Sequence, residues 1–347
     1  MVGLRQRRSS PIARAFAESL LDQAQARSEQ GLSRQFGIGN HEIKLHFSWL
    51  DEISDLVAGA FCLSAPSEKQ TTTDVHIVRL SRDGISFPDL EWAREWIEAC
   101  ELVPSAVTSP YRIFIDKNQG VIYCYDEFKR RAVVVLRSSH EMDSRSLITP
   151  FRLLWSWISS SHSVSIVHAG AISLKDRGVL LAGPSGSGKS TLSMAVATSA
   201  SGLFAADDCV AVAKARAHAV YSRVKLGADT ASEILGSPVQ RVPAHLPEAQ
   251  QAKPFLQLSG TEHWFRQQID LAAIVFPVIA GQTGHYRLEV QQAQRMLTAD
   301  SQRELFGGSP QDTIRLAKLV RALPAYRLLL GDNLGANIRA LENILGK

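Results

Sequence analysis

The nine residues GPSGSGKST, Gly183 to Thr191, constrain this chain more than any other stretch does. They follow the apolar run GVLLA and precede the helix-like run KSTLSMAVATSA. A GxxxxGK[ST] sequence between a strand and a helix is the pattern of a loop that cradles phosphate groups. Its glycines let successive N–H groups point inward, and the helix N-terminus adds free N–H groups and a positive dipole end. We therefore expect a phosphate-binding loop in an α/β nucleotide-binding core.

The residues of this loop have distinct expected tasks. Lys189 is expected to reach the β- and γ-phosphates of a nucleotide, and the Ser190 hydroxyl is expected to bind Mg²⁺. The loop recognises phosphates and not bases, so the motif alone leaves the base open. The residues expected to contact the nucleotide are Gly183, Ser185, Gly186, Ser187, Gly188, Lys189, Ser190 and Thr191.

The pattern of apolar residues divides the chain into three segments. Residues 1–40 are polar and partly helical, with a helix expected in ARAFAESLLDQAQAR. Residues 41–145 predict a small α+β domain with a helix in PDLEWAREWIEAC and strands in IKLHFSW, VHIVRL, YRIFID, GVIYCYD and RAVVVLR. The last three strands are expected to form an antiparallel meander. Residues 146–347 open with a helix in LITPFRLLWSWISS and continue as the α/β core, with a strand in LFAADDCVAVA that turns at its two aspartates.

Composition excludes several classes of protein. The 38 Lys and Arg residues exceed the 34 Asp and Glu residues by only four, which gives no basic surface for nucleic acid. The four cysteines have no CxxC spacing and predict neither a zinc site nor a disulfide framework. No run approaches the roughly 18 apolar residues of a membrane span. These features predict a cytoplasmic protein with neither a nucleic-acid nor a membrane partner, and they are compatible with a homo-oligomer.

Two common nucleotide-binding classes fit poorly. The loop sequence is common in ABC transporter ATPases, and LQLSG at Leu256–Gly260 resembles the start of their signature loop. Downstream of the phosphate loop, however, no hydrophobic run ends in adjacent Asp and Glu, and the stretch LSGTEHW lacks the second glycine of such a signature. The guanine-binding motif NKxD of GTPases does not occur in the sequence.

Three spaced elements give a more specific resemblance. His168 lies in VHAGAISL before the loop, and Asp207 and Asp208 lie in LFAADDCV after it. This arrangement resembles the HPr serine kinase/phosphorylase family. The resemblance implies an HPr kinase-like P-loop kinase core, a mixed sheet with flanking helices, preceded by the small α+β domain. It also implies ATP and Mg²⁺ as cofactors, and transfer of a phosphoryl group to a serine.

The resemblance also assigns roles to these three residues. It implies Asp208 as the general base, Asp207 near Mg²⁺, and His168 as a residue that helps to hold charge. Adjacent strand residues face opposite sides, so the two aspartates need a backbone turn to serve one site. The PAYRL stretch near the end of the chain and the unrelated first half are similar to kinases of lasso-peptide gene clusters. This similarity implies a peptide or small-protein acceptor, recognised by residues 41–145.

The sequence departs from bifunctional family members at two loop positions. Those members usually carry aspartate where this chain has Pro184 and glutamate where it has Thr191. We therefore expect the kinase direction, with neither HPr as substrate nor phosphorolysis. Two alternatives stay open: a kinase for a small metabolite such as free serine, and a nucleotide-binding regulatory protein without an acceptor.

Some further residues are candidates for a place near the nucleotide. Arg223, Lys225 and Lys253 could neutralise phosphate, although a place on the solvated surface is an equal expectation for each. The stretch from Leu246 to Ser259, rich in Gln and Pro, is expected to form a mobile loop that closes over the nucleotide.

Overall fold

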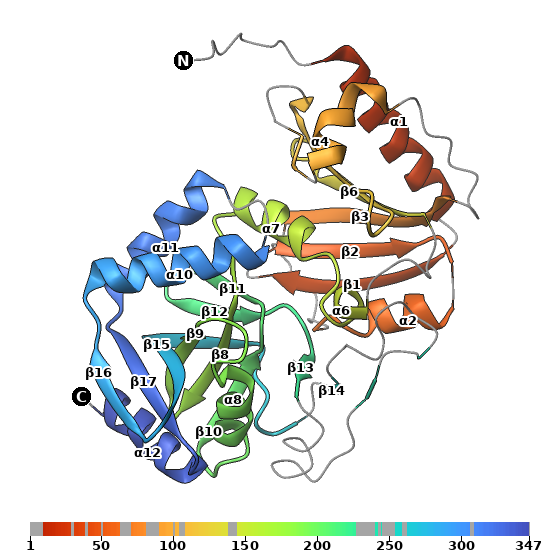
Figure 1. Ribbon diagram of the computed structural model, residues 1–347. Coiled ribbons are helices and arrows are strands. Elements are labelled where there is room, and N and C mark those ends of the chain that lie inside the picture. Colours follow the sequence, from red (N-terminus) through yellow and green to blue (C-terminus); the bar gives the residue numbers. More distant parts are fainter. Residues whose placement is uncertain are drawn as a thin grey trace, which may run out of the picture.

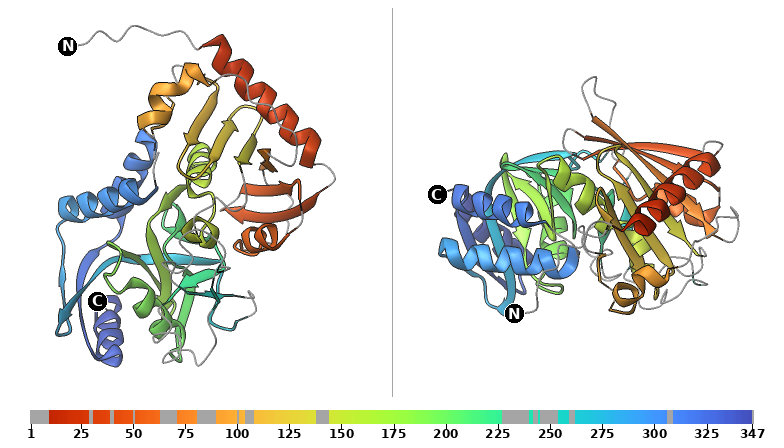
Figure 2. Two further views of the ribbon diagram at one scale, coloured as in Figure 1. Left: turned by 45° about the vertical axis from the view of Figure 1, so that its right-hand side comes forward. Right: turned by 90° about the horizontal axis from the view of Figure 1, so that it is seen from above.

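The computed structural model has two large sheets and several helices (Figure 1). It describes residues 10–28, 31–38, 41–49, 51–62, 71–80, 90–99, 101–103, 108–137, 144–226, 240–241, 244, 254–258, 262–305 and 309–346. In Figure 2 the N-terminal elements, red to yellow, lie at one end of the molecule, and the blue C-terminal elements lie at the other.

The first sheet has six strands in the order β1-β2-β3-β6-β5-β4. Its strands are β1 Leu32–Ile38, β2 His41–Phe47, β3 Thr71–Arg79, β4 Tyr111–Asp116, β5 Val121–Asp126 and β6 Arg131–Leu136. The pairings β4–β5 and β5–β6 are antiparallel, which confirms the expected meander. In contrast, β3 runs parallel to both β2 and β6, so this sheet is mixed.

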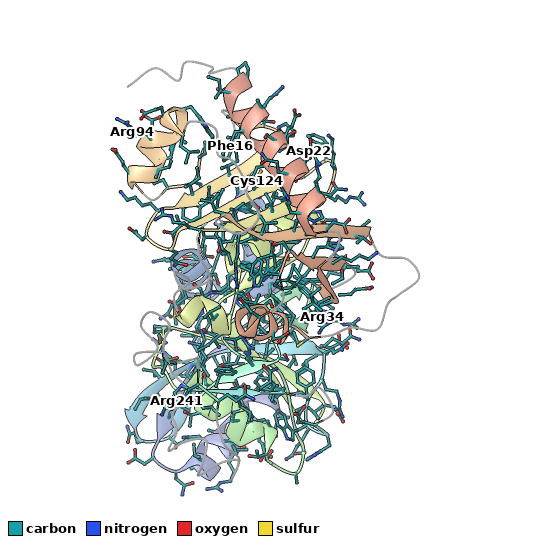
Figure 3. The ribbon with its side chains drawn as sticks, turned by 90° about the vertical axis from the view of Figure 1, so that its right-hand side faces the viewer. Phe16, Asp22, Arg34, Arg94, Cys124 and Arg241 are labelled. Carbon is teal, nitrogen blue, oxygen red and sulfur yellow. The ribbon has the colours of Figure 1, made fainter. Side chains whose placement is uncertain are left out.

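Helix α1, Pro11–Ser28, packs on one face of this sheet. Phe16 and Leu20 of the helix belong to one buried cluster with Cys124 and Val133 of the sheet, and Figure 3 labels Phe16 and Cys124. Strand β1 pairs with β2 along its whole length. The sheet therefore begins before the boundary that the sequence suggests at residue 40.

The described part of the first half of the chain also contains short helices. They are α2 Glu52–Ala58, α4 Arg94–Ala99, which the single 3-10 turn η1 Glu91–Ala93 precedes, and α6 Ser144–Ile148.

The second sheet follows the order β10-β8-β9-β15-β12-β11-β7, and β17 and β16 extend it from β15. Its strands are β7 Ser165–Val167, β8 Ala169–Leu174, β9 Arg177–Ala182, β10 Gly202–Ala206, β11 Val210–Ala213, β12 Arg216–Ala219, β15 Gln268–Gly281, β16 Gly284–Arg287 and β17 Ala325–Gly331. Strand β15 is parallel to β9 and β17, whereas β8 is antiparallel to β9 and β10. A separate ribbon pairs β13 Arg223–Lys225 with β14 Phe255–Gln257.

Helices cover both faces of the second sheet. On one face, α8 Lys189–Ala197 and α12 Leu334–Leu345 pack on Leu181 and Val275 of the sheet. On the other face, α10 Val290–Leu305 and α11 Pro310–Ala322 pack on Leu180 and Ile274. This arrangement confirms the expected mixed α/β sheet with flanking helices. Among the described helices, none is both long enough and apolar enough to cross a bilayer.

The helix expected over LITPFRLLWSWISS is interrupted in the structure. Helix α6 ends at Ile148, and α7 spans Arg152–Ser161. Pro150 has no N–H to donate and disfavours helical geometry at the residue before it, and Phe151 takes a left-handed backbone with φ of 61°. The Pro150 carbonyl accepts hydrogen bonds from Trp155 and Tyr221, which fix the break against the rest of the protein.

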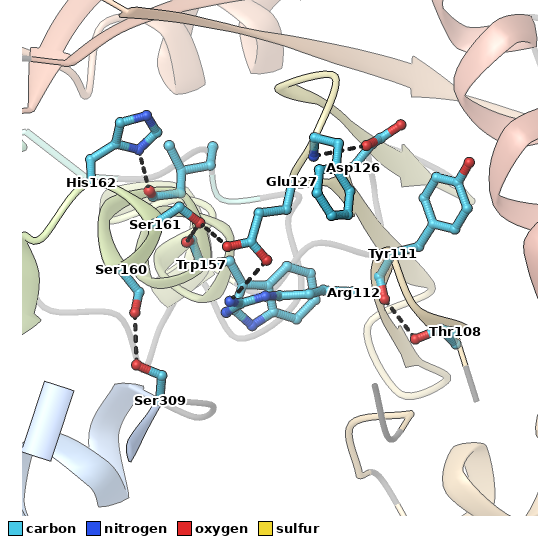
Figure 4. Close-up of polar contacts among 12 residues, drawn as sticks. Thr108, Tyr111, Arg112, Asp126, Glu127, Trp157, Ser160, Ser161, His162 and Ser309 are labelled. Atoms are coloured by element: carbon cyan, nitrogen blue, oxygen red, sulfur yellow. Dashed lines mark hydrogen bonds and ion pairs between the residues drawn. The ribbon is translucent and has the colours of Figure 1, made fainter. Parts of the chain in front are cut away.

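Helix α7 links the two halves of the chain. Its Trp155 shares a buried cluster with Phe47 of the first sheet and with Tyr221 and Phe255 of the second half. At its end, the Ser160 hydroxyl lies 2.7 Å from that of Ser309, which caps α11 (Figure 4). The next hydroxyl, of Ser161, donates to Glu127, whose carboxylate also accepts from Arg112 (Figure 4).

The first sheet contains two buried histidines, and their burial predicts that the free energy of unfolding decreases in acid. Burial, then neighbouring charges, lowers the pKa of His41 to about 3 and that of His76 to about 4. Their unfolded pKa is about 6.5, so the unfolded chain takes up these protons first as the pH falls. At pH 5 the cost for His76 alone is about 1–2 kcal/mol.

We therefore expect His76→Asn to reduce the loss of unfolding free energy between pH 7 and pH 5, measured by urea denaturation. His263, which is exposed, provides the matched control, and His263→Asn should leave the pH dependence unchanged. An equal pH dependence in wild type and His76→Asn would contradict the assignment.

Candidate active site

The glycine-rich loop connects β9 to α8, as the sequence predicts. Gly186 and Gly188 have φ of 83° and 93°, a left-handed region that side chains rarely adopt. A Cβ on Gly188 would also lie 2.5 Å from the Leu330 side chain, whereas a Cβ on Gly186 would meet nothing within 4 Å. The loop thus requires glycine at both positions for its backbone, and at Gly188 for packing as well.

Lys189 is the first residue of α8 and lies inside the loop. Its ammonium donates to the carbonyl oxygens of Gly183 and Pro184 at 2.6 and 2.9 Å, and only 6% of the residue is exposed. The side chain therefore folds back along the loop that it belongs to. The Ser187 hydroxyl is also buried, and it forms no hydrogen bond within the described part of the chain.

The two aspartates lie where the chain leaves β10 and enters β11. Asp208 has φ of 65°, a left-handed conformation that turns the backbone between the two side chains. Asp207 hydrogen-bonds with Ser190 of α8, while Asp208 pairs with Lys225 of β13. The turn that the sequence requires at this pair is therefore present, and the two carboxylates have different partners.

Asp207 contacts the beginning of the phosphate-loop helix directly. The Ser190 hydroxyl donates to Asp207 Oδ1 at 2.8 Å, and the Lys225 backbone N–H donates to Oδ2 at 3.1 Å. Burial, followed by the negative charge of Asp208, raises the pKa of this carboxyl to about 6, although both hydrogen bonds oppose the shift. Positive charge brought to this position would favour its ionised form.

Asp208 has a strongly cationic environment. Lys225 Nζ lies 2.7 Å from its Oδ2, and His168 Nδ1 lies 3.4 Å from its Oδ1. Burial disfavours the charged form of this carboxyl. The charge of Lys225, and then those of His168 and Arg152, nonetheless lower its pKa well below the ordinary value. Asp208 is therefore ionised at neutral pH.

His168 packs against the same turn. The residue is 2% exposed, and its Nδ1–H donates to the backbone carbonyl of Asp208 at 2.9 Å. This hydrogen bond holds the imidazole at the aspartate turn, so His168 helps to fix the conformation of Asp208.

The oxygen atoms of Ser190 and Asp207 suit a hard divalent cation. Mg²⁺ prefers oxygen ligands and usually takes only one or two carboxylates from a protein, with the remaining positions filled by water and substrate phosphates. The two oxygens already lie within hydrogen-bond distance of each other. In the part of the chain that the structure describes, no group of three or more His, Cys, Asp and Glu residues forms a metal site.

The structure thus brings together the loop, Ser190, Asp207, Asp208 and His168. Lys225 also lies at the site, paired with Asp208. Arg223 is 3% exposed, so it does not lie on the solvated surface. Its guanidinium donates to the carbonyls of Leu56 and Leu147 and to the Gln257 side chain.

Other expected residues fall largely outside the described part of the chain. Lys253 and most of the expected mobile loop, residues 246–259, lie outside it. The described portion of that loop contains β14, which pairs with β13. Three residues near the C-terminal end of the expected loop are therefore part of a paired ribbon.

Two residues near the site have no signal in the sequence. Thr149 Oγ1 lies 3.4 Å from Lys225 Nζ, and the charge of Arg152 contributes to the low pKa of Asp208. Thr149 lies in the segment before α7 and Arg152 is the first residue of α7, so both come more than 50 residues before Asp208 in the sequence. Neither belongs to a motif, so only the fold reveals their position.

Comparisons with known proteins give little further information. No family model and no curated protein matches this chain. Among solved structures, a match is the HPr(Ser) kinase/phosphatase from Coxiella burnetii, at 10% sequence identity and a TM-score of 0.26. The alignment covers 52% of this chain and 96% of that one. A likeness with so low a TM-score supports no conclusion about this protein.

Proposed function

We propose that this protein is an ATP- and Mg²⁺-dependent serine kinase with an HPr kinase-like P-loop core in residues 146–347. It transfers the γ-phosphoryl group of ATP to a serine hydroxyl of a peptide or small protein. In this proposal residues 41–145 recognise the acceptor, and the protein acts in the cytoplasm. The lasso-peptide resemblance favours the C-terminal serine of a precursor peptide as the acceptor.

The hydrogen bond between Ser190 and Asp207 carries the proposal. It brings a carboxylate from the β10–β11 turn to the first turn of the phosphate-loop helix, at 2.8 Å. A glycine-rich loop without a ligand would not need a carboxylate at this point. A metal held between a helix-start hydroxyl and a strand-end carboxylate is the arrangement that phosphoryl transfer uses in P-loop proteins.

The loop and its lysine supply positioning and positive charge. Phosphoryl transfer proceeds through a loose transition state, so orientation and charge stabilisation provide most of the catalysis. Lys189 lies in the loop and is buried, and its ammonium now donates to the carbonyls of Gly183 and Pro184. When a nucleotide binds, the same ammonium would donate to phosphate oxygens instead. Ser190 and Asp207 would hold Mg²⁺, which would supply further positive charge at the phosphates.

Asp208 is the proposed proton acceptor. It is ionised at neutral pH because Lys225 and His168 lie beside it. The serine oxygen forms a bond to the γ-phosphorus, the bond between the γ-phosphorus and the bridging oxygen breaks, and the serine proton passes to Asp208. In a loose transition state the proton leaves late, so a weakly basic carboxylate suffices.

A transfer assay tests the proposal. The protein is mixed with Mg²⁺ and ATP labelled at the γ-phosphate, together with peptides encoded near its gene. We expect label on a serine of one such peptide and none on the same peptide with that serine replaced by alanine. Label on free serine alone would identify a metabolite kinase instead, and ATP hydrolysis without any labelled acceptor would favour a regulatory protein.

A further inference from the structure

We propose that Lys225 is a positioning residue that holds both aspartates of the site, and that Arg223 ties its strand to the first half of the chain. This inference rests on the proposed function. It assigns to the short strand β13 the task of placing the general base, and it gives the N-terminal half a physical connection to the catalytic residues.

Lys225 contacts both aspartates through different atoms. Its backbone N–H donates to Asp207 Oδ2 at 3.1 Å, and its ammonium donates to Asp208 Oδ2 at 2.7 Å. The ammonium also lies 3.4 Å from Thr149 Oγ1 in the segment before α7. Only 18% of the side chain is exposed, and 22% of that of Asp208, so water screens this ion pair only partly.

The conformation of Asp208 explains why such a residue is needed. The backbone of this residue is left-handed, which is unfavourable for a side chain with a Cβ. Two adjacent carboxylates also repel each other at the turn. A cation at Asp208, together with the His168 hydrogen bond to its carbonyl, offsets both costs and gives the carboxylate one orientation.

Arg223 anchors the strand that carries Lys225. The two residues are two positions apart on β13, so their side chains share a face of the strand. The guanidinium donates to the carbonyl of Leu147 at 2.8 Å and to that of Leu56 at 2.5 Å, and it lies 4.7 Å from the centre of the Phe255 ring. Leu56 belongs to α2 in the N-terminal domain, and Leu147 belongs to α6, which spans the boundary between that domain and the core. The guanidinium therefore connects β13 to the N-terminal domain and to the junction that follows it.

The local backbone supports the same connection. Ser222, the residue before β13, donates its N–H to Ala60 at 2.8 Å, and Cys62 donates to Val220 at 3.3 Å. The segment leading into β13 is therefore hydrogen-bonded to the segment that follows α2. A shift of the N-terminal half would displace β13 and, through Lys225, the Asp208 carboxylate.

The test compares Lys225→Met and Lys225→Arg with wild type. For Lys225→Met we expect kcat for phosphoryl transfer to fall about 10- to 100-fold, with the KM for ATP changed by less than about threefold. Lys225→Arg keeps the charge and should recover much of the lost kcat. Lys318→Met, on the exposed surface of α11, serves as the control for loss of one positive charge and should match wild type.

A crystal structure of the variant tests the position of Asp208 independently of enzyme activity. In a crystal structure of Lys225→Met, the Asp208 carboxylate should move by about 1 Å or more, or become disordered, while the glycine-rich loop stays in place. An unmoved carboxylate, or a loss in kcat matched by an equal loss of ADP binding, would overturn the proposal. Failure of the proposed function looks different: wild type would bind no MgADP, or would bind it and label no acceptor.

Discussion

Replacement of Asp208 by asparagine is expected to lower the rate of phosphoryl transfer by about 10²- to 10⁴-fold. Asparagine has nearly the same shape but cannot accept the serine proton. The amide can still accept a hydrogen bond from Lys225, so the turn and the phosphate loop should keep their structure. We therefore expect the affinity for MgADP, measured by calorimetry, to change by only a few fold while turnover is nearly lost.

Asp270 supplies the matched control for this substitution. It is an exposed aspartate that pairs with Arg216 on the surface of the second sheet. Asp270→Asn should leave both transfer and binding unchanged. If Asp208→Asn retains more than about a tenth of the wild-type rate, another group accepts the proton and the assignment of the general base is wrong.

The glycine-rich loop and the aspartate turn could be predicted because their signals are local. The spacing from Gly183 to Ser190 prescribes a loop and a helix start within one stretch of chain, and the structure has both. The need for a turn at Asp207 and Asp208 follows from the alternation of side chains along a strand. The left-handed backbone of Asp208 is the form that this turn takes.

The burial of Arg223 could not be predicted from the local sequence. The arginine in YSRVKL is expected to lie on the surface, because buried cations usually need a carboxylate. Here the carbonyls of Leu56 and Leu147 satisfy the guanidinium, and these residues lie 167 and 76 positions away in the sequence. Such partners exist only after the chain has folded. The alternation of Arg223 and Lys225 on one strand was a usable signal that the two share a face.

The sequence contains a signal for the break before α7, although we expected one continuous helix there. Pro150 lies near the start of LITPFRLLWSWISS, and proline in that position ends or kinks a helix. The structure separates α6 from α7 there. The break also places Thr149 beside Lys225.

Removal of the Lys189 side chain is expected to abolish tight nucleotide binding and transfer together. In Lys189→Ala the affinity for MgATP should fall by about 10²- to 10³-fold, since a buried charge–phosphate interaction of several kcal/mol is lost. The carbonyls of Gly183 and Pro184 also lose their buried donor, so the loop itself should loosen. Calorimetric titration with a non-hydrolysable ATP analogue measures the loss.

The pattern across variants separates the role of Lys189 from that of Asp208. Lys189→Ala should lose binding and turnover, whereas Asp208→Asn should lose turnover alone, because only Lys189 lies in the proposed phosphate loop. Lys175→Ala, at an exposed lysine that pairs with Glu342, is the matched control and should bind the analogue as wild type does. If Lys189→Ala bound the analogue as tightly as this control, the loop would not be the phosphate site. The roles assigned to Ser190 and Asp207 would then fail with it, since both depend on phosphates held above α8.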